Sequence, residues 1–155
     1  METESLVRLL REHPFLQGLS EEHLQTLASC AANVRFEAGQ WVLREGEEAR
    51  RFYLLRSGRI AIEVYVPGRG PVPMQTIGEG EVLGWSWLVL PYRWHFDARA
   101  MQLTRAISLD AECLRARSEQ DHELGYELLK RFVPVILQRL QAARLQLLDV
   151  YRANG

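Results

Sequence analysis

The stretch VLREGEEARRFYLLRSG, residues 42–58, places an apolar run between two turn signals. Gly46, Glu47 and the small Ala49 precede the apolar letters FYLL, and Gly58 follows after two more residues. A short apolar run bounded by glycines is typical of a buried strand. Similar β-rich runs alternate with turn residues from about 33 to 109, and most of the chain's 11 glycines fall there. This spacing predicts a β-sandwich or barrel.

Three segments of this central region predict how its strands are built and connected. In residues 59–66 the even-numbered residues are branched and apolar, and they alternate with Arg, Ala, Glu and Tyr. This period of two predicts a half-buried strand. The letters RSGR, residues 56–59, lie between two apolar runs and indicate a hairpin turn. The stretch VPGRGPVP, residues 66–73, predicts the tip of a hairpin because it is rich in Gly and Pro.

The N-terminal part of the chain, residues 3–32, has a helical pattern. Leu6 and Leu9 begin an apolar stripe that stops before Pro14. A second helix is predicted after Ser20, whose hydroxyl suits an N-cap and which is followed by two glutamates in the first turn.

The C-terminal part predicts a short helix over residues 110–118 and a long one over residues 121–152. The long helix should kink near Pro134, which removes one backbone hydrogen bond. Its apolar residues follow steps of four and three, which is a heptad seam. The seam consists of Leu129, Val133, Ile136, Leu140, Ala143, Leu147 and Val150. A helix of about 32 residues spans ~48 Å, more than a small barrel covers, so we expect a homodimer joined along the seam.

The stretch 42–58 resembles the first signature of the cyclic nucleotide-binding domain family, the sensory domain of catabolite-activator-type regulators and of kinase regulatory subunits. HPFLQGLSEEHLQTLA, residues 13–28, resembles the family's N-terminal helices. IGEGEVLG, residues 77–84, resembles its approach to the nucleotide pocket. The resemblance implies a mixed α and β fold, an eight-stranded antiparallel jelly-roll β-barrel with N-terminal helices and a long C-terminal dimerisation helix.

A length of 155 residues fits one domain. We therefore expect a single domain over residues 1–155, with N-terminal helices in 1–32, the β-barrel in 33–109 and C-terminal helices in 110–153.

The stretch GWSWLVLPYRWHFDARA, residues 84–100, falls where the family has its phosphate-binding cassette. The resemblance implies a Glu that binds the ribose hydroxyl and an Arg that neutralises the cyclic phosphate, with backbone N–H groups of a short helix around it. Here Trp85 stands at the Glu position. The Arg position falls on Trp94 or, with a shift of one residue, on Arg93.

The same stretch is expected to begin with a short helix after Gly84, to loop around Pro91 and to enter a strand at about His95. The candidate ligand-binding residues are Gly84, Trp85, Ser86, Trp87, Arg93, Trp94 and His95.

Two interpretations of this aromatic stretch stay open. In one, Trp85, Trp87 and Phe96 only fill the mouth of the barrel as core. In the other, aromatic walls stack a planar ligand, with Arg93 and His95 supplying the charge.

Enzyme activity and metal binding are not predicted. His95 and Asp97 share a strand face, as an acid–base pair would, but no nucleophile is evident beside them. The four histidines are dispersed and lack the ligand spacing of cupin-type metal sites.

Charge, hydropathy and cysteine content limit the classes of partner and the cellular compartment that we expect. A net charge of −1 provides no field for nucleic acid or an anionic membrane, and no stretch is apolar enough to span a bilayer. Cys30 and Cys113 lie far apart in the sequence, and we expect free buried thiols in a reducing cytoplasm.

The sequence therefore predicts a stand-alone, cytoplasmic ligand-sensing regulatory domain with a diverged phosphate-binding cassette. No resident cofactor is assigned; the candidate ligand is a cyclic nucleotide or another small planar anion. The domain would signal through its dimer helix to a separate protein and would not bind DNA directly. The alternative is a ligand-free dimeric scaffold or interaction module on the same fold.

Overall fold

The structure is a computed structural model that describes the backbone of residues 2–154 and the side chains of residues 4–149, 151 and 152. Its helices are α1 (Glu2–Glu12), α2 (Glu21–Ala28), α3 (Ala111–Gln120) and α4 (His122–Asn154), with short 3-10 helices η1 (Pro14–Leu16) and η2 (Ser86–Leu88). Its strands are β1 (Ala31–Phe36), β2 (Trp41–Leu43), β3 (Arg51–Ser57), β4 (Arg59–Val66), β5 (Gly70–Gly78), β6 (Val82–Leu83), β7 (Asp97–Ala100) and β8 (Thr104–Asp110). The mixed α and antiparallel β class is as predicted.

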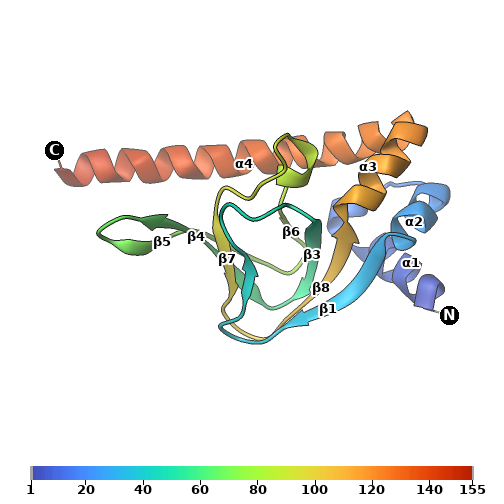
Figure 1. Cartoon of the computed structure of the whole chain (residues 1–155), viewed down its shortest axis with the longest axis horizontal. Coiled ribbons are helices and arrows are strands. Elements are labelled where there is room, and N and C mark those ends of the chain that lie inside the picture. The colour runs from blue at the N-terminus through green and yellow to red at the C-terminus, as the bar shows by residue number, and fades with distance from the viewer. Residues whose placement is uncertain (1, 155) are drawn as a thin grey trace.

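The strands form two four-stranded antiparallel sheets, one in the order β1-β8-β3-β6 and the other in the order β2-β7-β4-β5. The predicted closed barrel is therefore not seen in residues 2–154, where the strands form a sandwich of two open sheets. The long α4 lies along one side of the sandwich, and α1 and α2 lie beside the sheet that holds β1 and β8 (Figure 1).

The predicted hairpin at RSGR, residues 56–59, is wrong. The strands β3 and β4 on either side of it belong to different sheets, so the chain crosses from one sheet to the other at Gly58. Gly58 has φ +96, and a Cβ there would lie 2.5 Å from the Cα of Thr104. A glycine that fits a hairpin turn also fits a tight corner, because both need a left-handed backbone or a close approach. The hairpin predicted over residues 66–73 is correct, since β4 pairs with β5 up to Val66 and Gly70.

The helix starts follow the sequence signals. The Ser20 hydroxyl accepts a hydrogen bond from the His23 N–H at 3.2 Å, as predicted for an N-cap. The Asp110 carboxylate does the same for the Cys113 N–H at 2.8 Å, at the start of α3. The helix α4 runs as one element through Pro134.

An aromatic cluster joins α4 to the sandwich. The rings of Phe52 in β3 and Trp87 in η2 are stacked with centroids 4.9 Å apart, and Phe132 of α4 meets both at their edges. All three side chains are buried. This cluster fixes the N-terminal half of α4 and positions the segment that follows Gly84.

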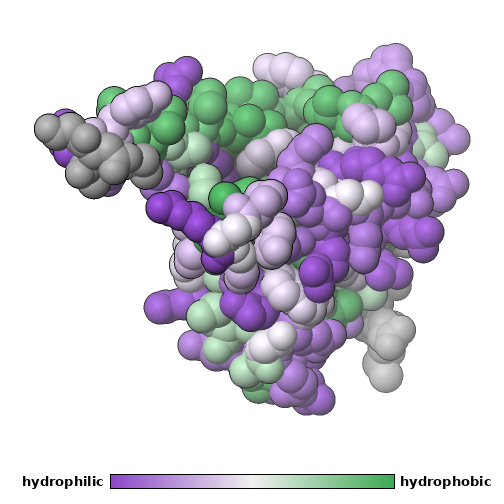
Figure 2. Space-filling model, turned by 60° about the vertical axis from the view of Figure 1, so that its left-hand side comes forward, coloured by the Kyte–Doolittle hydropathy of each residue, from purple (hydrophilic) through white to green (hydrophobic). Residues whose placement is uncertain are grey.

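The outer face of α4 remains apolar and exposed. Figure 2 shows a hydrophobic band along this helix. The exposed apolar side chains of α4 are Tyr126, Leu129, Val133, Leu137, Leu140, Leu145, Leu147, Leu148 and Tyr151. Although α4 has 33 residues, no helix in the described part of the chain combines the length and apolar character that a bilayer crossing needs.

Cys30 and Cys113 form a disulfide, so the prediction of free thiols is wrong. Cys30 lies between α2 and β1, and Cys113 lies in the first turn of α3. Their Cα atoms are 5.8 Å apart, a usual disulfide separation, because β1 and β8 run antiparallel and bring Ala31 beside Leu109. The two cysteines are 83 positions apart in the sequence, so only the pairing of the strands reveals that they lie side by side.

Candidate functional site: a pocket between the long helix and the sheet

The segment 84–100 has nearly the predicted local structure. Gly84 has φ +100, η2 begins two residues later at Ser86, and the chain turns at Tyr92 with φ 57. The strand β7 begins at Asp97, two residues after the predicted start at His95. The segment therefore forms a short helix, a loop and a strand.

Trp94 occupies the space over Gly84. The side chain is buried, and a Cβ on Gly84 would lie 2.5 Å from Cη2 of the indole. The Trp94 N–H donates to the Glu47 carbonyl at 3.0 Å, which ties this position to the loop after β2. The indole therefore packs directly over the glycine that opens the predicted cassette.

Arg93 lies outside the pocket. Its side chain is exposed and its Nη1 donates to the carbonyl of Gly46 at 3.2 Å. Its backbone forms an isolated bridge with Glu48. Of the two residues that the sequence left open, Trp94 is the one buried against Gly84, and Arg93 contacts the 46–48 loop.

Ser86 and Trp87 belong to the core. Trp87 is 1% exposed and stacks on Phe52, and its carbonyl accepts from Nη1 of Arg115 at 2.8 Å. Ser86 is also buried. The core interpretation therefore describes these two residues, whereas Trp85 lies at the edge of an open cavity.

This cavity, of about 330 Å³, lies between α4 and the sheet that contains β4 and β5. The cassette contributes Trp85, His95 and Phe96, and the sheet contributes Ile62, Val64, Met74 and Gln75. The helix contributes Ile136, Arg139, Leu140, Ala142, Ala143 and Gln146. Its volume is at the lower end of the range of small-molecule sites, and its lining is mainly apolar with a few polar groups.

Arg139 is the functional candidate that the sequence analysis missed. Its Nη2 donates to the Val82 carbonyl, and its guanidinium carbon lies 5.2 Å from the centre of the Trp85 ring. Its Nη1 is buried and has no hydrogen-bond partner among the described residues. Burial lowers the pKa of Arg139 to about 10, partly opposed by the charge of Glu81, so the side chain is still a cation at neutral pH.

One signal in the sequence could have located Arg139. It lies three residues after Ile136 and four before Ala143, on the helix face that points to the sheet. A single Arg on an inward face is uncommon unless it is paired. The heptad assignment instead placed Ile136 and Ala143 on a dimer seam and left Arg139 beside it.

The predicted seam residues divide between two faces of α4. Leu129, Val133, Leu140 and Leu147 are exposed. Ile136 and Ala143 are partly buried and line the cavity, and Leu140 borders it too. The side chain of Val150 lies outside the described residues. The seam as a dimer interface stays a prediction.

His95 and Asp97 do not form a hydrogen bond to each other among the described residues. The His95 side chain is exposed at the cavity, whereas Asp97 is buried and its Oδ1 accepts from the Glu45 N–H at 2.7 Å. Asp97 therefore supports the loop after β2.

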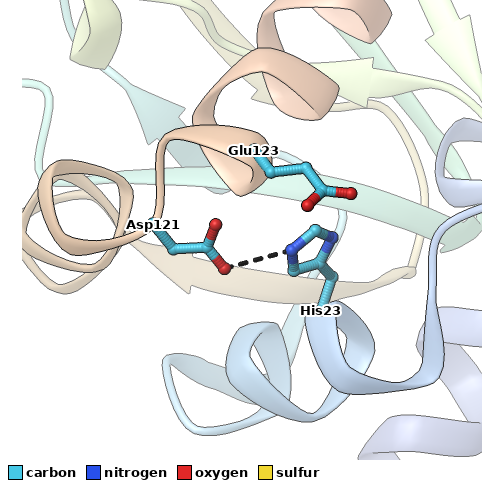
Figure 3. Close-up of side chains that lie close together, drawn as sticks. All are labelled: His23, Asp121 and Glu123. Atoms are coloured by element: carbon cyan, nitrogen blue, oxygen red, sulfur yellow. Dashed lines mark hydrogen bonds and ion pairs between the residues drawn. The ribbon is translucent and has the colours of Figure 1, made fainter.

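A different cluster joins α2 to the start of α4. His23 is buried, and its Nε2 lies 3.1 Å from Oδ2 of Asp121, with Glu123 on the other side of the ring (Figure 3). The other carboxylate oxygen of Asp121 accepts from the Leu124 N–H at 3.3 Å. This backbone bond, followed by the contact with His23, lowers the pKa of Asp121. The cluster therefore caps α4 and ties it to α2.

Comparison with known proteins agrees with this geometry. The family model described as cyclic nucleotide-binding domain matches residues 33–121. The cAMP-dependent protein kinase regulatory subunit of Schizosaccharomyces pombe is 30% identical over 143 residues, which is 81% of this chain and 33% of that protein. The chain spans a tenth of the length of human cGMP-dependent protein kinase 2, which it also matches.

Two solved structures have a similar fold. A protein of Geobacter metallireducens described as a cyclic nucleotide-binding protein has a TM-score of 0.78 and 26% identity, covering 86% of this chain and 96% of its own. The sensor domain of the transcriptional regulator DNR from Pseudomonas aeruginosa has a TM-score of 0.72 and 24% identity, covering 91% of this chain and 95% of its own.

Proposed function

The chain belongs to the cyclic nucleotide-binding domain family, and we propose that it is a ligand-sensing regulatory domain of that family whose cassette no longer suits a cyclic phosphate. The ligand is a small planar anion held in the cavity beneath α4. The domain has no catalytic role of its own. The observation that carries this proposal is an open, mainly apolar cavity beside a cassette segment in which Trp94 packs over Gly84.

Ordinary cyclic AMP should bind weakly. At the position after Gly84 the family's acceptor for the ribose hydroxyl is replaced by Trp85, whose indole can only donate. A hydrogen bond to a charged group is worth about 1.5–3 kcal/mol, so its loss lowers affinity by roughly tenfold to a hundredfold. The indole of Trp94 in place of the phosphate Arg removes a second attraction.

The signal is proposed to travel through α4. This helix forms one wall of the cavity, and its outer face is apolar and exposed. A ligand that contacts Arg139 and Ala143 would therefore bias the position of the helix. A second copy packed on the outer face would form a dimer and carry that change to a separate output protein.

Finer features of the fold fit the same proposal. Successive strands alternate between the two sheets, except that β4 and β5 are neighbours in one sheet, and β1 lies beside β8 in the other. This order supports a jelly-roll connection rather than a simple meander.

The second candidate is a ligand-free dimeric scaffold. The burial of Trp87, Trp94 and Phe96 favours it, because these rings act as core at the mouth of the sandwich. The cavity and the unpaired Nη1 of Arg139 favour the sensing function instead.

A thermal-shift screen of cyclic mononucleotides, other nucleotides and small organic acids tests the proposal. A pocket ligand at a hundred times its Kd should stabilise the protein by about 2.7 kcal/mol. The same compound should not stabilise Val64→Phe, in which a ring narrows the cavity from the sheet side. If no compound stabilises the unmodified protein more than it stabilises Val64→Phe, the scaffold function is correct.

A further inference from the structure

Arg139 presents an unused donor to the cavity. Its Nη2 is bonded to the Val82 carbonyl, while its Nη1 is buried without a partner in the described part of the chain. A buried polar group without a partner is destabilising, and a buried cation more so. No polar group of the lining accepts from it among the described residues, and the side-chain amide nitrogen of Gln146 donates to the Met74 carbonyl on β5.

The charges around the cavity leave room for one anion. Burial lowers the pKa of Arg139, the charge of Glu81 only partly opposes this, and the two side chains form no ion pair among the described residues. One oxygen of Glu81 accepts instead from the Gly78 N–H at 2.7 Å. His95 adds a polar edge at the exposed side of the cavity. A single guanidinium in an apolar cavity matches a single negative charge on an apolar body.

We propose that the cavity binds a small monocarboxylate with a planar aromatic body, whose carboxylate accepts a hydrogen bond from Nη1 of Arg139. This inference rests on the proposed function and names the ligand class of the same site. A charged donor and a carboxylate form a strong hydrogen bond, more so in a site that excludes water. The apolar body lies against Val64 and Met74 of the sheet and beside the ring of Trp85.

The site suits a carboxylate better than it suits a phosphate. A phosphate monoester carries more charge and more acceptor oxygens than one half-used guanidinium can satisfy. For a cyclic phosphodiester, Trp94 covers the cassette glycine that would add backbone donors. Because Arg139 lies on α4 and stacks over Trp85 of the cassette, the carboxylate would link the helix to the cassette directly.

Calorimetric titration of 3-phenylpropanoate and 2-naphthoate, each compared with its neutral amide, tests the inference on the full chain. We expect at least one acid to bind at least tenfold more tightly than its amide. Arg139→Met should weaken that acid at least tenfold and leave the amide unchanged. The matched control Arg144→Met, an exposed Arg on the same helix, should bind the acid like the unmodified chain.

Equal affinity for acid and amide, or no effect of Arg139→Met, would overturn the carboxylate class. No binding of either acid would overturn it as well, while the broader screen decides separately whether the cavity has any ligand. If circular dichroism shows that Arg139→Met does not fold, Val64→Phe takes its place. We expect Val64→Phe to abolish acid binding, and unchanged binding would place the acid elsewhere and overturn the inference.

Discussion

Gly84 and Trp94 form a tight contact at the start of the predicted cassette. The glycine has a left-handed backbone, with φ +100. The indole packs against its bare Cα, where a Cβ would lie 2.5 Å from the ring. The proposed function interprets this contact as the loss of the cassette's anion position.

Substitution of Gly84 by Ala tests this packing. The positive φ costs about 1–3 kcal/mol for a residue with a Cβ, and the overlap with Trp94 adds a similar amount, so we expect a total loss of about 2–6 kcal/mol. Gly39→Ala is the matched control, because Gly39 has φ +87 but open space around it, and it should show the strain alone. Urea unfolding measures both variants. Equal losses would mean that Trp94 does not occupy this space.

His13 gives the protein a pH dependence on the acid side. Its Nδ1 accepts from the Phe15 N–H at 3.2 Å, so its Nε2 must carry the proton that is donated to the Leu55 carbonyl at 3.0 Å. Burial lowers the pKa of His13, and the bond to Leu55 only partly opposes this. The folded protein therefore holds the neutral ring.

The sign of the effect follows from the lowered pKa. The unfolded chain takes up a proton near pH 6.5 and the folded chain only at lower pH, so stability is full above about pH 6.5 and falls below it, by at most about 1.4 kcal/mol per pH unit. His13→Gln should reduce this slope between pH 7 and pH 5, whereas the exposed His122→Gln should not. The free energy of unfolding at each pH provides the measurement. If His13→Gln leaves the pH dependence of the free energy of unfolding unchanged, other titratable groups cause it.

At the scale of elements, the contacts that matter join segments distant in sequence. The disulfide connects the end of α2 with α3, and the crossing at Gly58 connects the two sheets. Local signals cannot reveal either, because a cysteine spacing of 83 residues or a glycine turn is compatible with several pairings. The same local signals did predict the helix cap at Ser20, which depends only on neighbouring residues.

Removal of the disulfide should destabilise the protein. Closing a loop of this length restricts the unfolded chain, and Cys113→Ala should lower the free energy of unfolding by about 2–4 kcal/mol. The difference should disappear when both proteins are unfolded with a reductant present. Thiol titration of the denatured, unreduced chain should find no free thiol. Two free thiols would contradict the pairing.

The outer face of α4 should hold two chains together. Leu140 lies near the middle of this face and is 46% exposed. Leu140→Asp would place a charge in the interface, at a cost of several kcal/mol if it stays unpaired. Light scattering should then fall from twice the chain mass of 17.9 kDa to the monomer, or show aggregates. Gln138→Asp, exposed on another side of α4, is the control, and an unchanged Leu140→Asp dimer would refute the interface.

For the whole molecule, the sequence predicted the family, the mixed class and the order of the elements, because the signature at 42–58 and the periodic runs are local patterns. Its assignment of Trp85 and of Trp94 or Arg93 to the cassette's anchoring positions stays a prediction. The sequence analysis missed Arg139 because the depth of a helical residue depends on which face packs on the sheet. The choice between a dimer seam and an inward face of α4 is likewise a property of the folded chain.

The central claim is that this family fold has lost its ordinary phosphate site while keeping a cavity beneath α4. Calorimetric titration of the unmodified chain with cyclic AMP and with cyclic GMP tests it most directly. With Trp85 and Trp94 at the two anchoring positions, we predict no binding or a Kd well above micromolar for both. A sub-micromolar Kd for either nucleotide would contradict the claim.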